Sequence, residues 1–209
     1  MKRLKILWLV ALLFPLGAVT ACTESDDEEA ADEFANWKSR NEAFFSTLED
    51  SISHDATVWK KIKTYTKDES TVGVNTDYIY AKVIETGSGD TSPLYSDSVR
   101  LAYRGRLIPS VTYPQGYVFD QTFVGDYSIK TTAVLDRVAS DYVDGFTTAL
   151  QHMHRGDWWR VYIPHTLGYG TSTDFSGTIP GYSVLIFDLI LIDYISSKGA
   201  FAPWNSRQF

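Results

Sequence analysis

The chain has 209 residues, of which 44% are hydrophobic and 14% aromatic, and its formal net charge at pH 7 is −7. This length and composition suit one globular domain with additional segments and argue against two full domains. The acidic balance argues against nucleic acid as a partner, because phosphate binding needs a basic surface.

The first 21 residues are typical of a bacterial export signal. A basic start, MKRLK, precedes an apolar run from Ile6 to Leu16 that is too short to span a membrane stably. The motif VTAC at residues 19–22 resembles the lipobox of bacterial lipoproteins, which implies removal of residues 1–21 and a lipid anchor on Cys22. The alternative is a free, buried Cys22. Because it is the only cysteine, an intramolecular disulfide is excluded.

Residues 22–33 are expected to form an acidic, disordered tether. From Thr23 to Glu33 there are seven acidic residues and no basic one, so this stretch favours a solvated chain. An acidic run directly after a lipidated cysteine resembles the surface-export signal of Bacteroidetes lipoproteins, and a plain spacer is the alternative. The expected location is the outer membrane of a Gram-negative bacterium, on its periplasmic face or at the cell surface.

Residues 34–66 are predicted to form a helical extension. Apolar residues recur at steps of mostly three and four between Ala31 and Ile52, which indicates an amphipathic helix, and the apolar residues from Val58 to Tyr65 suggest a second short helical piece. Two interpretations stay open: the aromatic face packs on the main domain, or it serves a partner or self-association of two chains. Residues 66–77 are predicted to be a linker or turn.

The rest of the chain is mostly predicted strand. The strand patterns run from Tyr78 to Glu85, from Val99 to Arg104, from Trp158 to Ile163 and from Val184 to Ile192. One short helix is predicted from the spacing of apolar residues between Phe146 and Met153. The expected fold class is therefore α+β, a largely antiparallel sheet with one short helix laid across it.

Several familiar kinds of chemistry are missing from the sequence. The glycine-rich stretch GYGTST lacks the lysine of a phosphate-binding loop, and GSGDTS lacks the third glycine of a dinucleotide-binding fingerprint, so both are predicted to be turns. His152 and His154 stand two residues apart on a predicted helix and point away from each other, which is poor geometry for a metal site. No Gly-x-Ser-x-Gly elbow occurs. We therefore expect no metal, no cofactor and no covalent intermediate.

Four blocks in order carry a family resemblance: VRLAYRGRL, YVFDQT, VDGFTTALQHMHRGDWWRVYIPHTLGYG and IPGYSVLIFDLILI. Together they resemble the FK506-binding-protein (FKBP) family of peptidyl-prolyl cis-trans isomerases. The resemblance implies an FKBP-like domain at residues 78–195, with an antiparallel sheet curled around one short helix, followed by a tail at residues 196–209. It also implies isomerisation of X-Pro bonds in proline-containing exported polypeptides, without a cofactor.

The resemblance also assigns the pocket residues. The residues it places in catalytic roles are Tyr103, Phe119, Asp120, Tyr169 and Phe187, and those it places in substrate binding are Tyr142, Val143, Phe146 and Ile179. Phe146 stands where the family usually has tryptophan, and Tyr142 replaces a small apolar residue. Phe123 and Tyr127 are candidates for a further aromatic wall, and Phe175 for the pocket mouth.

Alternatives remain for these residues and for the function. The aromatic residues singly suit ordinary core packing, and Asp120 suits a structural hydrogen bond to a tyrosine such as Tyr103. The domain is expected to be a lipid-anchored isomerase that assists folding, or else a catalytically weak binding or chaperone module. In the tail, Phe201, Trp204 and Phe209 either pack on the domain or serve a partner.

Overall fold

The structure is a computed structural model that describes residues 33–174, 176–197 and 199–205. The export signal, Cys22, Phe175 and Phe209 lie outside the described residues. Within the described ranges, no helix has the length and apolar character needed to cross a membrane.

Seven strands form one antiparallel sheet in the order β1-β2-β6-β7-β3-β4, with β5 paired to β3 beside β4. The strands are β1 (Trp59–Lys63), β2 (Tyr78–Glu85), β3 (Ser98–Arg106), β4 (Val118–Gln121), β5 (Leu135–Val138), β6 (Trp158–Ile163) and β7 (Leu185–Ile195). The helices among the described residues are α2 (Trp37–His54) and α3 (Asp144–Leu150), with short 3-10 turns η1 (Asn75–Asp77), η2 (Ala139–Asp141) and η3 (His165–Leu167). The predicted α+β fold is confirmed.

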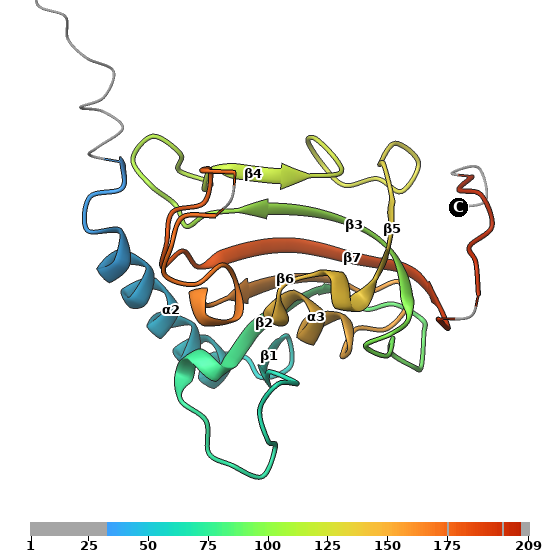
Figure 1. Cartoon of the computed structure of the whole chain (residues 1–209), viewed down its shortest axis with the longest axis horizontal. Coiled ribbons are helices and arrows are strands. Elements are labelled where there is room, and N and C mark those ends of the chain that lie inside the picture. Colours follow the sequence, from blue (N-terminus) through green and yellow to red (C-terminus); the bar gives the residue numbers. More distant parts are fainter. Residues whose placement is uncertain (1–32, 175, 198, 206–209) are drawn as a thin grey trace, which may run out of the picture.

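The main core lies between the sheet and α3, which crosses one face of the sheet (Figure 1). Alternate residues of the central strands supply it, as in the buried run Leu185, Phe187, Leu189 and Leu191 of β7. The helix lies close to the sheet because Gly145 has no side chain: a Cβ there would be 2.3 Å from Ile163 Cγ2. This close approach holds the start of α3 against the sheet.

A smaller apolar cluster occupies the opposite face of the sheet. It consists of Ala102, Phe123, Ile190 and Ile192, with Tyr127 and Trp158 packed against it. The same face buries Asp188 of β7, whose carboxylate accepts hydrogen bonds from Arg160 Nε at 2.7 Å and from Arg106. Pairing of this kind is what makes a carboxylate tolerable in a buried strand, because an unpaired buried charge is strongly destabilising.

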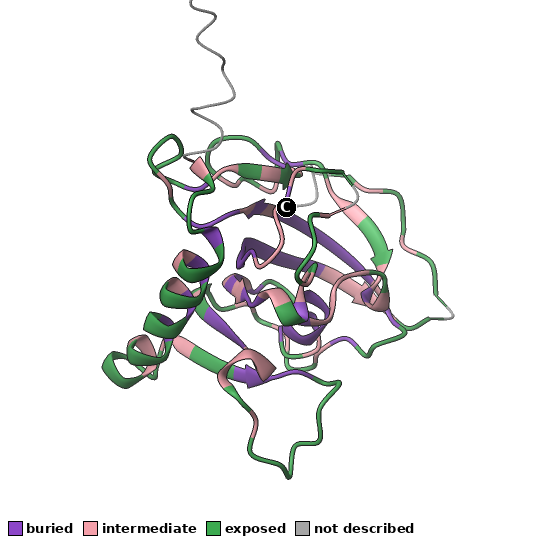
Figure 2. Cartoon of the chain, turned by 60° about the vertical axis from the view of Figure 1, so that its left-hand side comes forward, coloured by how far each residue is buried: buried purple, intermediate pink, exposed green. Residues whose placement is uncertain are grey.

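The long helix α2 packs on the domain. Its buried residues are Trp37, Asn41, Phe45 and Leu48, which form a single stripe at helical spacing. Figure 2 shows buried strands at the centre of the sheet and exposed residues along the outer side of α2. The expectation that the aromatic face of this segment packs on the main domain is confirmed.

The second helical piece predicted between Val58 and Tyr65 is wrong. This stretch contains strand β1, which pairs antiparallel with β2 from Trp59 opposite Lys82 to Lys63 opposite Tyr78. Five residues are too few for periodicity to separate a helix from a strand, and the tertiary pairing decides the outcome. The predicted helical extension at 34–66 is thus a helix followed by an edge strand of the sheet.

The described part of the C-terminal tail packs on the domain. The guanidinium of Arg100 lies 4.4 Å from the ring centroid of Phe201 and 5.5 Å from that of Trp204. Arg100 also donates to both carboxylate oxygens of Asp136 at 2.7 Å and to the carbonyl of Ala202 at 2.9 Å. The tail therefore closes over a charged side chain of β3.

Candidate active site

A cavity of about 430 Å³ opens where the sheet meets the start of α3 and the loop that precedes β7. Its lining residues are Tyr103, Phe119, Asp120, Asp141, Tyr142, Val143, Phe146, Tyr169, Asp174, Ser176, Thr178, Ile179 and Phe187. The structure thus brings all nine pocket residues named from the sequence to one cavity. Its size falls in the range of small-ligand pockets, roughly 300–1,000 Å³.

Three strands build the back of the cavity. Gly105 of β3 pairs with Phe187 of β7 on one side and with Asp120 of β4 on the other. A Cβ on Gly105 would lie 2.5 Å from the Phe119 ring and 2.6 Å from the Phe187 ring, so only glycine leaves room for both. These two rings meet edge to face with centroids 5.5 Å apart. The glycine in the motif AYRGR thereby positions two aromatic walls.

Phe146 of α3 forms the floor. Its ring meets Phe187 edge to face at 4.9 Å and Tyr103 at 5.9 Å. Tyr142, just before the helix, stacks on Phe146 with centroids 4.4 Å apart and an interplanar angle of 24°. The smaller floor residue is therefore accompanied by a second ring, which occupies space beside it. Burial raises the pKa of Tyr142 to about 12.

Asp120 and Tyr103 are joined by a hydrogen bond from the phenol to carboxylate oxygen Oδ2, as the sequence suggested for this carboxylate. Tyr103 is buried and Asp120 is exposed at the cavity edge. Burial raises the pKa of Tyr103, and the hydrogen bond and charge of Asp120 raise it further. The phenol therefore stays protonated at neutral pH and keeps donating, which fixes the carboxylate over the cavity.

The loop wall comes from residues 168–174 and 176–184, which we call the pocket loop. Tyr169 is 48% exposed, and burial of its remainder together with the charges of Asp174 and Asp120 raises its pKa. Its phenol is therefore a donor at neutral pH. Ile179 is buried, and its N–H donates to Asp174 Oδ1 at 2.6 Å.

Asp174 organises a turn in this loop. Its N–H donates to the carbonyl of Ile179 at 2.9 Å, and Ser176 donates to its carboxylate through both the hydroxyl and the N–H. Burial opposes ionisation of Asp174, but these hydrogen bonds outweigh it and lower the pKa. An ionised Asp174 thus holds Ile179 at the cavity.

Two predictions about the walls fail or lie outside the described residues. Phe123 and Tyr127 belong to the apolar cluster on the opposite face of the sheet, where their rings meet at 5.4 Å. Phe123 follows the end of β4 at Gln121, and the path of the chain there carries its side chain to the opposite face of the sheet. Phe175 lies outside the described residues.

The cavity also contains residues that the sequence did not single out: Asp141, Asp174, Ser176 and Thr178. Asp141 adjoins Tyr142, and Asp-x-Ser at 174–176 is a pattern that favours an Asx turn. That pattern was a usable signal for the turn, but not for its distance from the aromatic walls. Among the described residues, no group of three or more His, Cys, Asp or Glu side chains is placed to hold a metal ion.

Comparison with known proteins agrees with this geometry. Residues 89–192 match the family model described as FKBP-type peptidyl-prolyl cis-trans isomerase. This chain carries an FKBP-type domain. The match runs from before β3 into β7 and includes every residue that lines the cavity, whereas α2, β1 and β2 precede it. The expectation of an FKBP-like domain is confirmed.

Three curated relatives illustrate the similarity. The macrophage infectivity potentiator of Trypanosoma cruzi is 39% identical over 52% of this chain and 49% of its own length. The outer membrane protein MIP of Legionella longbeachae is 35% identical over 53% of this chain and 42% of its own length. The FKBP-type 22 kDa peptidyl-prolyl cis-trans isomerase of Escherichia coli is 30% identical over 54% of this chain and 48% of its own length. The chain thus spans about half the length of these relatives.

The fold comparison extends further along the chain. The crystal structure of FkpA from Escherichia coli shares 23% sequence identity and superposes with a TM-score of 0.51, covering 82% of this chain and 67% of that one. At this identity the likeness shows the fold and no more.

Proposed function

We propose that this protein catalyses cis-trans isomerisation of X-Pro bonds in exported polypeptides, in the cavity formed by the FKBP-type domain. One observation carries the proposal above the others: a cup of aromatic and aliphatic side chains has Asp120 and Tyr169, a fixed carboxylate and a phenol donor, at its edge. This combination suits a proline ring with its flanking carbonyl groups.

The reaction needs no bond to the enzyme. An X-Pro amide rotates over a barrier of about 18–20 kcal/mol, because resonance is lost in the twisted state. The twisted amide is less polar than the planar one, so an apolar surround that excludes water stabilises it preferentially. Each tenfold gain in rate needs about 1.4 kcal/mol of such preference.

The proposed roles follow from position. Phe119, Val143, Phe146 and Phe187 form the cup that takes the proline ring. Tyr169 donates a hydrogen bond to a substrate carbonyl and holds the chain across the cup. Asp120 keeps Tyr103 in place and interacts with the carbonyl carbon as the amide twists.

A second function is favoured by one observation. Tyr142 stacks on the floor residue Phe146 and lines the cavity, so its ring fills space that a small apolar residue would leave open. A pocket narrowed in this way suits a catalytically weak module that binds proline-containing segments. A measured rate of catalysed isomerisation separates the two functions, because the isomerase accelerates exchange and the binding module does so weakly.

The test is an isomerisation assay on a short proline peptide with the purified protein, beside Asp120→Ala and Tyr169→Phe. We expect the wild type to accelerate exchange and both variants to be slower by about tenfold, the loss of one good hydrogen bond or charge contact. No acceleration above the blank by a folded wild type contradicts the enzyme. A fast wild type with two equally fast variants refutes the site roles and leaves the activity standing.

We also propose that Cys22 carries a lipid and anchors the chain to the outer membrane. The support is the lipobox-like motif VTAC together with the similarity to a relative whose name places it in the outer membrane. Labelling of cells with a palmitate analogue should mark the wild type and leave Cys22→Ala unlabelled. Protease treatment of intact cells then separates a surface-exposed protein, which is digested, from one facing the periplasm.

A further inference from the structure

A buried amide interrupts the apolar stripe of α2. Asn41 is 1% exposed, and both polar atoms of its side chain are bonded: Nδ2 donates to the Trp37 carbonyl at 2.8 Å, and Oδ1 accepts the N–H of Val184 at 2.8 Å. Val184 is the last residue of the pocket loop before β7. A polar group buried in a helix–sheet contact requires such partners, so Asn41 links the helix to this backbone position.

A second buried contact lies one helical turn earlier. Trp37 Nε1 donates to Ser183 Oγ at 2.9 Å, and that hydroxyl donates to the Pro180 carbonyl at 2.6 Å. Pro180 follows Ile179, which lines the cavity. A short chain of hydrogen bonds thus runs from α2 to the residue next to a pocket contact.

The loop carries this constraint to its other half. The Tyr182 N–H donates a hydrogen bond to the Gly170 carbonyl at 2.9 Å. The half of the loop that contacts α2 is therefore bonded to the residue after Tyr169. Tyr182 has φ of 64°, in the left-handed region, which a tyrosine adopts only when its surroundings hold it there. Lys38 of α2 lies over the Tyr182 ring, 4.8 Å from its centroid.

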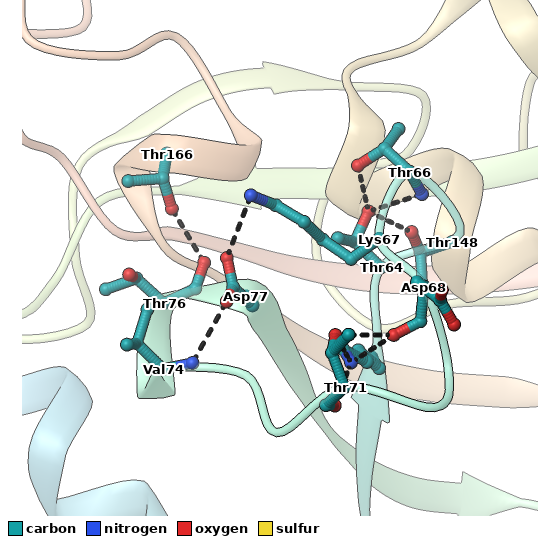
Figure 3. Close-up of polar contacts among 11 residues, drawn as sticks. Thr64, Thr66, Lys67, Asp68, Thr71, Val74, Thr76, Asp77, Thr148 and Thr166 are labelled. Carbon is teal, nitrogen blue, oxygen red and sulfur yellow. Dashed lines mark hydrogen bonds and ion pairs between the residues drawn. The ribbon is translucent and has the colours of Figure 1, made fainter.

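The segment between β1 and β2 supports the neighbouring parts of the site. Figure 3 shows Thr166 of η3 donating to the Thr76 carbonyl, at 2.7 Å, and Thr148 of α3 donating to Thr64, at 3.2 Å. Within the same segment, Lys67 Nζ lies 3.6 Å from Asp77 Oδ1. Two of the segments that carry pocket residues, α3 and the stretch from η3 onward, are therefore hydrogen-bonded to residues that precede the FKBP match.

We propose that α2 is a positioning element of the site, in which Asn41 and Trp37 hold the pocket loop in the shape that places Ile179 and Tyr169 at the cavity. Neither residue touches the cavity, so both act through the loop. The effect of α2 on substrate binding rests on the proposed isomerase function, whereas its effect on the shape of the pocket loop does not.

The experiment compares Asn41→Ala with Leu48→Ala, a matched control. Leu48 is also buried on α2, and its side chain packs in the core without bonding the pocket loop. Hydrogen exchange of the purified protein reports the loop directly: in Asn41→Ala we expect protection of the Val184 and Tyr182 amides to fall about tenfold more than that of the central β7 amides. Leu48→Ala should lower protection without singling out these two amides.

Kinetics of the same variants report the consequence. We expect Asn41→Ala to lower kcat/KM about fivefold, mainly by raising KM, because the cup is intact and only the loop contacts are displaced. Trp37→Phe, which keeps an aromatic ring and loses the N–H donor, should shift KM in the same direction by about twofold and serves if Asn41→Ala does not fold. Leu48→Ala should stay within about twofold of wild type at a temperature where it is folded.

The outcomes separate this proposal from the proposed function. Unchanged exchange of the Val184 and Tyr182 amides in Asn41→Ala, or an equal selective loss in Leu48→Ala, overturns it. If Asn41→Ala does not fold, unchanged exchange of the Val184 and Tyr182 amides in Trp37→Phe overturns the positioning role of α2. Selective loss of protection with an inactive wild type supports the positioning of the loop and contradicts the isomerase. Selective loss with unchanged kcat/KM and KM contradicts the effect on substrate.

Discussion

The two walls of the cavity are built in different ways. The cup wall is made of side chains on β3, β4, β7 and the start of α3, where rings such as Phe146 and Phe187 pack against one another at 4.9 Å. The loop wall, with Tyr169 and Ile179, is held by the hydrogen bond that the Ile179 N–H donates to Asp174 and by bonds with helix α2. This helix is distant in the chain, since Trp37 and Ser183 are 146 positions apart. Packing shapes the first wall and polar contacts shape the second.

This difference predicts how substitutions in each wall affect stability and activity. Removing a ring from the cup opens a cavity in the core, which affects stability and activity together. Removing a polar contact from the loop displaces a surface segment, which affects activity with a smaller change in stability.

The largest effect is expected for Phe187→Ala. The substitution should lower the free energy of unfolding by about 3–5 kcal/mol, and it removes a ring that touches Tyr103, Phe119 and Phe146. We expect kcat/KM of the remaining folded protein to fall about 100-fold, measured beside urea unfolding. Phe123→Ala is the control on the opposite face of the sheet, with a comparable loss of stability and kcat/KM within about twofold. Equal losses of activity would show that destabilisation alone explains the result.

The next effect concerns the contact between Asp120 and Tyr103. A hydrogen bond to a charged group contributes about 1.5–3 kcal/mol, so Asp120→Ala and Tyr103→Phe should each lower kcat/KM by roughly tenfold. The double variant should lose much less than the product of the two losses, because both remove one contact. Asp126→Ala, an exposed carboxylate away from the cavity, is the charge control. Full additivity would mean that the two residues act separately.

A smaller effect is expected in the loop wall from Asp174→Asn. The amide oxygen still accepts a hydrogen bond but lacks the charge, so the turn that holds Ile179 weakens. We expect kcat/KM to fall about threefold with a shift in melting temperature of only a degree or two, for a change worth under about 1 kcal/mol. A loss of activity as large as that of Phe187→Ala would remove the distinction between the two walls.

The smallest effect is expected from pH. The pKa of Tyr103 and that of Tyr169 are raised above the ordinary tyrosine value, and that of Tyr142 is about 12. Each phenol therefore keeps its proton while pH rises to the ordinary tyrosine value, and donation to Asp120 or to substrate persists. We expect kcat/KM to stay within about twofold between pH 7 and pH 9.5. A decline with a midpoint near pH 8 would indicate that a different group controls the reaction.

The same contrast explains what the sequence could predict. Strands β2 and β6 match their predicted bounds, because period-two patterns with bounding turns describe half-buried strands well. The cup residues were found because each sits in a short motif at family spacing. Nothing local in the sequence marks Asn41, a single polar residue in an apolar stripe, as the partner of Val184.

The remaining errors have a similar origin. The apolar spacing from Val58 to Tyr65 predicts a short helix, whereas the chain forms strand β1 there because it pairs with β2. Phe123 is a candidate for a further aromatic wall in the sequence, but the direction of its side chain depends on the path of the chain after β4, which carries it to the opposite face of the sheet. Contacts between distant segments decide both cases.

We propose above that the cavity catalyses cis-trans isomerisation of X-Pro bonds. Exchange NMR on a short proline peptide tests it most directly, with the protein at a small fraction of the peptide concentration. The account predicts cis-trans exchange peaks within seconds, where the uncatalysed exchange takes tens to hundreds of seconds, and their strong reduction with Asp120→Ala. Exchange at the uncatalysed rate, with the folded wild type present, would contradict it.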